Sequence, residues 1–208
     1  DYVASIPAGG SPRTYRVVVG TSTPGWTEDD CDYLCTGTED DVVISQAIQS
    51  LPSGSETLYF LSGTYTFSNT LNINKSITLM GDNRISCFSS RGFPAIAVSA
   101  RGVTIRDIEI KCYDSDTSMD ITGSNFLMIN CEVGSVSAPI SVTGYEARFL
   151  DCNLTAMIIG ETGEDSNIRI DRCYINGLAF YSAVELRGNN IIINDCYFNN
   201  YKTAIYNS

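Results

Sequence analysis

The sequence repeats one six-residue pattern through its second half: Met128-Ile-Asn-Cys-Glu-Val133, Phe149-Leu-Asp-Cys-Asn-Leu154, Ile170-Asp-Arg-Cys-Tyr-Ile175 and Ile193-Asn-Asp-Cys-Tyr-Phe198. The four cysteines of these copies are separated by 21, 21 and 23 residues. An earlier copy, Ile105-Arg-Asp-Ile-Glu-Ile110, has Ile108 at the cysteine position. A fixed period of this length, with apolar residues alternating as in a strand, is typical of a β-solenoid.

Two further features recur in each period. A turn containing Gly or Asn precedes the pattern, and these residues tolerate left-handed backbone angles. A short apolar strand stands before that turn, at residues 95–98, 119–121, 140–142, 157–159, 184–186 and 204–206. Coils of this kind add about 4.8 Å each along the axis, and parallel crossovers are nearly always right-handed. We therefore predict an all-β fold, a right-handed parallel β-helix of about six to seven coils.

The N-terminal part predicts a different structure. A short strand at residues 15–20 and a polar loop precede the one clear helix, at about residues 39–51. Thr38 and Asp41 form a capping-box-like pair at its start. Its apolar stripe consists of Ile44, Ala47, Ile48 and Leu51. We expect residues 1–55 to cap the open end of coils formed by residues 56–208, in one continuous domain.

Composition excludes several function classes. The net charge of −11 argues against nucleic-acid binding, which needs clustered Lys and Arg. The absence of histidine excludes Ser-His-Asp and Cys-His catalysis and His-containing metal sites. The sequence contains no run of about 18 apolar residues, so it does not predict a membrane-spanning helix. Since the sequence starts at Asp1 and stops within another expected coil, we expect a piece of a longer chain.

Part of the sequence resembles a known family. The runs Gly20–Cys35, Gly37–Ile48, Leu51–Gly54, Gly63–Tyr65 and Ile77–Gly81 are similar to the N-terminal segment of pectate-lyase-like right-handed β-helix repeat proteins. The first of these runs resembles in particular β-helix proteins that prophages of Gram-positive bacteria encode as tail or minor structural proteins. The resemblance implies the fold. It does not imply one activity, because this fold carries lyases, hydrolases, epimerases and binding spikes.

The catalytic residues of that family are not carried over. Its polygalacturonase branch uses a histidine motif, and this chain has no histidine. Its pectate-lyase branch uses an acidic Ca²⁺ cluster with an Arg or Lys base, and no local motif here matches it. The nearest approach to such a cluster consists of Asp107, Glu109, Glu132 and Arg148.

We call the positions of Ile108 and of the four repeated cysteines the ladder. The residue that follows each ladder position is expected to point outward, because side chains alternate along a strand. This predicts an outer column of Glu109, Glu132, Asn153, Tyr174 and Tyr197. Tyrosine rings stack on sugar rings and carboxylates accept hydroxyl hydrogen bonds, so the column is a candidate glycan-binding strip. The alternative is a solvated sheet face on which like residues stack.

Arg148 and Arg169 are expected on the outer side of the preceding strand in neighbouring coils. Two stacked guanidinium groups could bind a carboxylate or phosphate. Nearby acids such as Asp171 could instead neutralise them. The residues just before the ladder positions, Asp107, Asn130, Asp151, Arg172 and Asp195, are expected to form corners, with an ion pair between Asp151 and Arg172.

The ladder itself, Ile108, Cys131, Cys152, Cys173 and Cys196, predicts a structural core column. Parallel stacking keeps neighbouring Cβ atoms farther apart than a disulfide prefers, so we expect reduced, buried thiols. Stacked thiols also do not form the tetrahedron of a metal site. For Cys31 and Cys35, a disulfide, free thiols and a turn-packing role all remain open, and we favour thiols.

We therefore predict a non-catalytic β-helix module of a phage tail appendage or surface-adhesion protein, located on a virion tail or at the cell surface. Its expected partner is a cell-surface polysaccharide, with no nucleic acid, no membrane and no cofactor or metal. If it is a tail spike, the resemblance implies a homotrimer. One alternative is a polysaccharide lyase acting by β-elimination with Ca²⁺, and another is a purely structural spacer.

Overall fold

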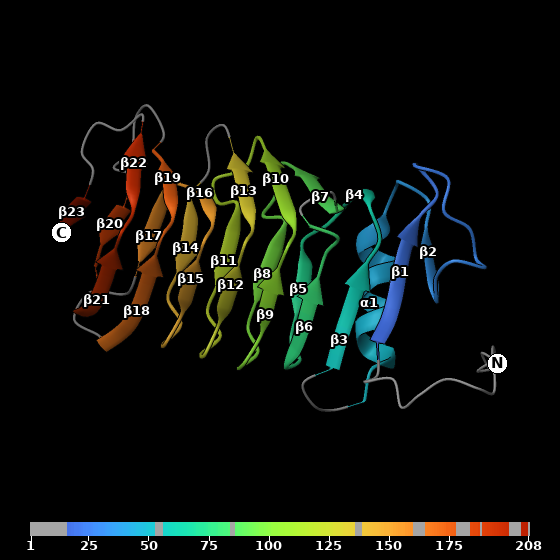
Figure 1. Cartoon of the computed structure of the whole chain (residues 1–208), viewed down its shortest axis with the longest axis horizontal. Coiled ribbons are helices and arrows are strands. Elements are labelled where there is room, and N and C mark those ends of the chain that lie inside the picture. The colour runs from blue at the N-terminus through green and yellow to red at the C-terminus, as the bar shows by residue number, and fades with distance from the viewer. Residues whose placement is uncertain are drawn as a thin grey trace.

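The chain winds into a parallel β-helix in the computed structural model (Figure 1). The structure describes residues 16–52, 56–83, 86–135, 139–159, 165–177, 184–187, 189–199 and 205–207. Each regular coil contributes one strand to each of three sheets, and each strand pairs in parallel with the strand one coil away. This arrangement confirms the predicted parallel β-helix.

Sheet A is the longest of the three sheets. In the described part of the chain it has nine strands, in the order β2 (Tyr33–Cys35), β1 (Arg16–Thr21), β3 (Glu56–Phe60), β6 (Ile77–Met80), β9 (Thr104–Arg106), β12 (Leu127–Ile129), β15 (Arg148–Leu150), β18 (Asp165–Asp171) and β21 (Asn189–Asn194).

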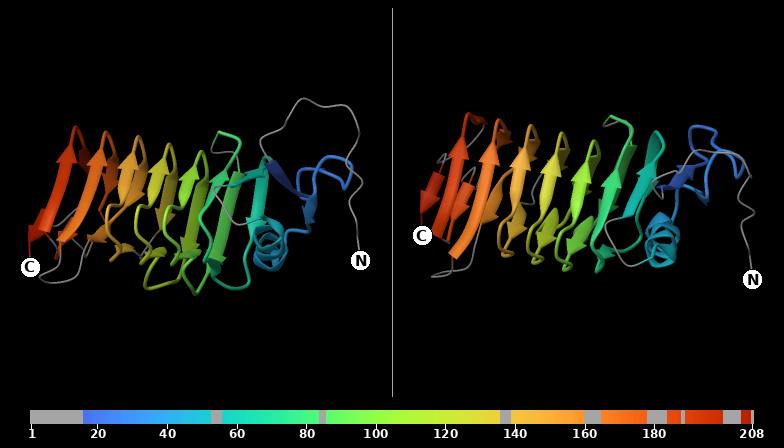
Figure 2. Two further views of the ribbon diagram at one scale, coloured as in Figure 1. Left: turned by 90° about the horizontal axis from the view of Figure 1, so that it is seen from below. Right: turned by 60° about the horizontal axis from the view of Figure 1, so that its bottom comes forward.

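Sheets B and C each have seven strands within the same ranges. Sheet B contains β4 (Gly63–Thr66), β7 (Ser86–Arg91), β10 (Glu109–Tyr113), β13 (Glu132–Ser135), β16 (Asn153–Thr155), β19 (Tyr174–Asn176) and β22 (Tyr197–Asn199). Sheet C contains β5 (Leu71–Ile73), β8 (Ile96–Val98), β11 (Met119–Ile121), β14 (Ile140–Val142), β17 (Met157–Ile159), β20 (Val184–Leu186) and β23 (Ile205–Asn207). Figure 2 shows the coils stacked side by side along one axis.

The core runs along the inside of this stack, since alternate residues of each strand point inward. Aromatic rings fill its N-terminal end, where the ring centroids of Phe60 and Phe88 lie 4.8 Å apart in an edge-to-face arrangement. Tyr65 packs against both rings, and its hydroxyl donates to the carbonyl oxygens of Val19 and Leu61 at 3.0 and 2.8 Å. A buried tyrosine is stable there because its one polar group is paired.

The corner between sheets A and B explains the cysteine ladder. The residue before each ladder position has left-handed backbone angles, with φ between 50° and 59° at Asp107, Asn130, Asp151, Arg172 and Asp195. The next residue is then buried: Ile108, Cys131, Cys152 and Cys173 are at most 3% exposed, and Cys196 is partly exposed.

Each ladder thiol also makes a hydrogen bond across its corner. Cys152 donates to the carbonyl oxygen of Leu150 at 3.1 Å, and the other three cysteines repeat this contact at 3.2 to 3.3 Å. The same carbonyl already accepts an N–H from a neighbouring corner, as Leu150 does from Asn130 at 3.0 Å. The cysteines therefore act as weak donors at a tight turn as well as small apolar residues.

The helix α1 (Asp40–Ser50) packs on the N-terminal end of the core, against β1, β2, β4 and β5 (Figures 1 and 2). Its buried stripe is the predicted one: Ile44, Ala47, Ile48 and Leu51. Lys75 caps the C-terminal end of the helix, because its ammonium donates to the carbonyl oxygens of Ile48, Gln49 and Leu51 at 2.8 to 3.2 Å.

The predicted cap of this helix is wrong. Glu39, not Thr38, is the N-cap residue; it has left-handed angles, and its side chain makes no capping bond. The buried carboxylate of Asp40 instead accepts the N–H groups of Thr36, Gly37 and Thr66 at 3.1, 3.0 and 2.8 Å. This carboxylate joins the turn before the helix to strand β4.

Replacing Asp40 with Asn should therefore destabilise the protein. The asparagine amide keeps only one acceptor oxygen, so it can accept either from Thr36 and Gly37 or from Thr66, but not from both sides. Its NH₂ group would then face the backbone N–H groups of the other side. We expect the free energy of unfolding to fall by about 1–3 kcal/mol in a urea titration. Glu39→Gln is the matched control, and we expect its effect to stay within about 0.5 kcal/mol. Equal effects of both substitutions would show that Asp40 is not the junction.

The thiols give a second prediction. All eight cysteines lie within the described residues and none forms a disulfide; Cys31 and Cys196 are partly exposed and the other six are buried. Burial raises the pKa of Cys87 to about 12, which further suppresses its thiolate. A thiol reagent followed by mass spectrometry should label Cys31 and Cys196 first in the native protein, and all eight in urea. Rapid native labelling of Cys131 or Cys152 would contradict the buried ladder.

Candidate functional site

One outer column of sheet B brings together the residues that the sequence placed on one line. Glu109 pairs with Glu132, Glu132 with Asn153, Asn153 with Tyr174 and Tyr174 with Tyr197, each directly across neighbouring strands. None of these five side chains is buried. We call these five residues the sheet B column.

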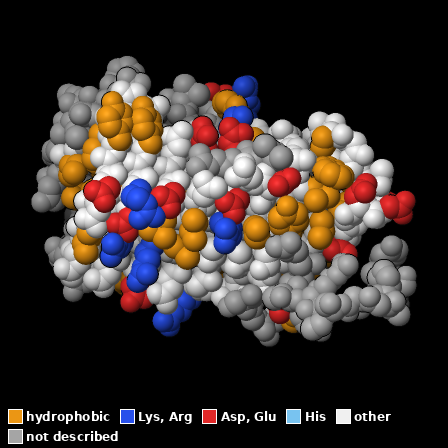
Figure 3. All heavy atoms as spheres, in the orientation of Figure 1, with side chains coloured by type: hydrophobic (Ala, Val, Ile, Leu, Met, Phe, Trp, Pro, Cys, Tyr) orange, Lys and Arg blue, Asp and Glu red, His pale blue; other side chains and the backbone are white. Residues whose placement is uncertain are grey.

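The two tyrosines form the most exposed part of this column. Their rings are stacked, with centroids 5.1 Å apart and planes 21° apart, and Tyr174 and Tyr197 are 37% and 62% exposed. Hydrophobic side chains accordingly stand out over β19 and β22 in Figure 3. Each ring covers one face of the other, so the free face of Tyr174 is the one on the side of Asn153. A sugar ring stacked on Tyr174 would therefore lie over Asn153.

Polar side chains border the tyrosine stack. Two residues further along the strands, Asn176 pairs with Asn199 on the same outer face. Asn176 is exposed and Asn199 is half-buried. Asparagine amides both donate and accept hydrogen bonds. With Asn153, this gives three amides around two aromatic rings, a combination that suits sugar hydroxyl groups.

The acidic end of the column is partly neutralised. Lys111 donates to Glu109 at 2.9 Å, and this bond raises the pKa of the lysine. Glu132 makes no ion pair within the described ranges. The column also continues to Cys87 and Thr64, which the sequence analysis missed together with strand β7. The run Ser86-Cys-Phe-Ser-Ser90 gave no signal because its residues do not alternate clearly between apolar and polar.

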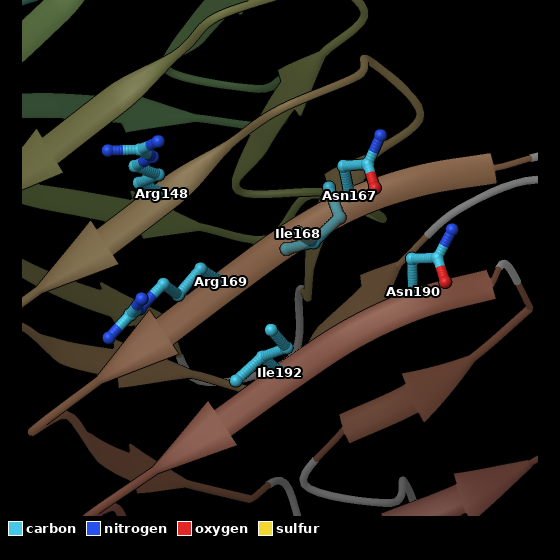
Figure 4. Close-up of a pocket in the computed structure, with 6 residues that line it drawn as sticks. All are labelled: Arg148, Asn167, Ile168, Arg169, Asn190 and Ile192. Atoms are coloured by element: carbon cyan, nitrogen blue, oxygen red, sulfur yellow. The ribbon is translucent and has the colours of Figure 1, made fainter.

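Arg148 and Arg169 lie on a different surface, the outer face of sheet A. They pair directly between β15 and β18, and both are exposed. They line a depression of about 420 Å³ together with Asn167, Ile168, Asn190 and Ile192 (Figure 4). The structure thus separates the arginine pair from the sheet B column.

Asp171 neutralises one of these arginines. Its carboxylate pairs with the Nε of Arg169 and accepts the amide of Asn194 at 2.9 Å. The bond from Arg169, followed by that from Asn194, holds the pKa of Asp171 below its ordinary value. At the corner beside it, Arg172 binds both carboxylate oxygens of Asp151 at 2.7 and 2.8 Å, which is the ion pair expected from the sequence.

The residues of the lyase hypothesis are not gathered at one site. Asp107 lies in the corner, where Arg106 and Asn130 donate to it at 2.8 and 2.7 Å. Glu109 and Glu132 lie on sheet B, and Arg148 lies on sheet A. Among the described residues, no group of three or more Cys, Asp or Glu side chains is placed to hold a metal ion. Nor does any helix in the described ranges have the length and apolar character to cross a membrane.

Comparisons with known proteins support the fold. No family model matches the sequence, and no curated protein matches it. A pectin methylesterase solved in complex with hexasaccharide VII superposes with a TM-score of 0.58 at 14% identity, covering 88% of this chain and 67% of the other. The ORF18 protein of Geobacillus virus E2 gives 0.52 at 18% identity, covering 78% of this chain and 40% of the viral one. The pectin methylesterase of Aspergillus niger gives 0.51 at 13%, covering 96% and 86%.

At these identities the likeness shows the β-helix and nothing finer. The neighbours include enzymes that act on a polysaccharide and one viral protein, so the fold alone does not choose between catalysis and binding.

The Asp171 ion pair predicts a pH dependence. A carboxyl whose pKa is lowered in the folded state stabilises the protein at pH values above its ordinary pKa of about 3.9, and that contribution is lost as the pH falls through the lower folded value. We expect a carbon-detected NMR titration to give Asp171 a pKa below the ordinary value of about 3.9, and Arg169→Gln to raise it. An unchanged Asp171 titration in Arg169→Gln would contradict the pairing.

Proposed function

We propose that this protein is a non-catalytic carbohydrate-binding β-helix module, which binds a glycan along the sheet B column. The single observation that carries the proposal is the exposed tyrosine stack, which Asn153, Asn176 and Asn199 border. Tyr174 and Tyr197 keep 37% and 62% of their surface exposed, and a contiguous exposed aromatic patch is typical of a surface that binds a ligand.

The groups on this surface favour ligand binding without catalysis. An acid–base mechanism would need two groups with matched pKa values facing one reacting bond. On this face Glu109 and Lys111 are paired with each other, and Arg148, the base of the hypothetical lyase cluster, is on another sheet. The sheet B column and its border offer two rings, three amides and two carboxylates, one of which is paired with Lys111. These are recognition groups.

We further propose that the module belongs to a phage tail appendage or surface-adhesion protein, acts on a virion tail or cell surface, and assembles as a homotrimer if it is a tail spike. The resemblance of residues 20–35 to prophage tail proteins supports this context, and the fold likeness to a viral protein is consistent with it. The expected target is a cell-surface polysaccharide.

A glycan panel tests the binding proposal. We expect calorimetry or an array to find a bound oligosaccharide, and the double variant Tyr174→Ala/Tyr197→Ala to weaken its binding at least about tenfold, which is about 1.4 kcal/mol. Tyr145→Ala is the matched control, since Tyr145 is 50% exposed but lies outside the column. We expect this control to bind as the unmodified protein does.

The same panel, run with and without Ca²⁺, separates the alternatives. Appearance of unsaturated uronate products, seen by ultraviolet absorbance, would overturn the non-catalytic assignment in favour of a lyase. Absence of binding to any polysaccharide of the panel would favour the structural spacer. Binding that survives both tyrosine substitutions would place the glycan elsewhere.

A further inference from the structure

We propose that the depression between Arg148 and Arg169 on sheet A is a second binding site, which takes one oxyanion, a carboxylate or a phosphate, carried by a small polyhydroxylated molecule. The site is separate from the sheet B column, and the proposal does not rest on the glycan-binding function.

The arginine pair is unusual for this chain. The sequence has 24 acidic and 13 basic residues, so most cations can find a carboxylate. Arg91, Arg106, Arg169, Arg172 and Arg187 each have one within 4 Å. Arg148 makes no ion pair or side-chain hydrogen bond to any described residue, although it stands directly beside another arginine. Like charges on directly paired residues are unfavourable unless an anion lies between them.

The local charge suits one anion. Asp171 occupies the Nε of Arg169 and leaves the two terminal nitrogens of that guanidinium. Arg148 keeps all five of its donors. Counting Arg148, Arg169 and Asp171, the site has one net positive charge. A carboxylate would bring it to zero, and a phosphate monoester would bring it to about −1. Either oxyanion would accept from two guanidinium groups at once.

The rest of the depression suits the body of the ligand. In Figure 4 both arginine side chains extend toward the same end of the strands, and Asn167 and Asn190 stand at the other end. Ile192, which is 51% exposed, follows Arg169 in the same outer column and lies between the two ends. Its side chain offers an apolar surface for ring C–H groups, and the two amides are matched to hydroxyl groups.

Binding of simple probes tests this site. Glucuronate, glucose 6-phosphate, glucose and inorganic phosphate are titrated at millimolar concentrations while arginine Nε–H signals are followed by NMR. We expect glucuronate or glucose 6-phosphate to shift the Arg148 and Arg169 signals, with an affinity that falls as salt is added, and glucose to shift neither. Which of the two sugar derivatives binds more tightly identifies the oxyanion as carboxylate or phosphate.

Variants locate the site. Arg148→Gln should weaken binding of the better probe about tenfold, and Arg148→Lys should keep part of it, because a lysine retains the charge but not the fork of donors. Arg187→Gln is the matched control, since Arg187 is also exposed but is paired with Glu185. Tyr174→Ala/Tyr197→Ala should leave probe binding unchanged, so this site can fail or succeed independently of the glycan proposal.

Three results would overturn the proposal. The first is no shift of either arginine with any charged probe. The second is equal binding by Arg148→Gln and the unmodified protein. The third is inorganic phosphate binding as tightly as glucose 6-phosphate and glucuronate, which would remove the role of Ile192 and the two asparagines.

Discussion

The hydrogen bonds between successive coils are the interaction on which the rest of the structure depends. A three-residue strand such as β12 cannot stand alone, and it exists because β9 and β15 satisfy its backbone groups on both sides. The same pairing fixes the register, so that position i of one coil lies beside the equivalent position of the next. Every side chain thereby becomes part of a column, and a single substitution changes one step of a continuous surface.

The corner between sheets A and B sets which columns face outward. A left-handed residue turns the chain, and the ladder residue that follows it goes into the core. The next residue must then point outward. The burial of Cys131 therefore determines the exposure of Glu132, and that of Cys173 determines the exposure of Tyr174. A buried corner residue thus positions the candidate binding surface.

The repeat made the fold and the columns predictable from sequence, because one period repeats the same environment. The sheet C strands and the inward and outward phases followed from it. Features without a period did not. The helix cap was missed because Glu39 adopts left-handed angles that Thr38 and Asp41 do not signal. The sequence offered Asp171 as a partner for the arginine pair, but its choice of Arg169 depends on rotamers. The depression beside it depends on Asn167 and Asn190 at separate turns. Sequence spacing contains no information on these.

Stacking in register favours like neighbours when they are aromatic or amide and penalises them when they are charged. The two like-charge steps in the outer columns are resolved in the same way. Lys111 neutralises Glu109, and Asp171 neutralises Arg169, which leaves Glu132 on sheet B and Arg148 on sheet A. Between them the Asp151–Arg172 pair neutralises itself. Since neither remaining charge packs a core or joins two coils, each is available to a ligand. A carboxylate beside rings and amides favours hydroxyl donors, and a guanidinium pair favours an oxyanion, so the two faces of one rigid stack are suited to different chemical groups.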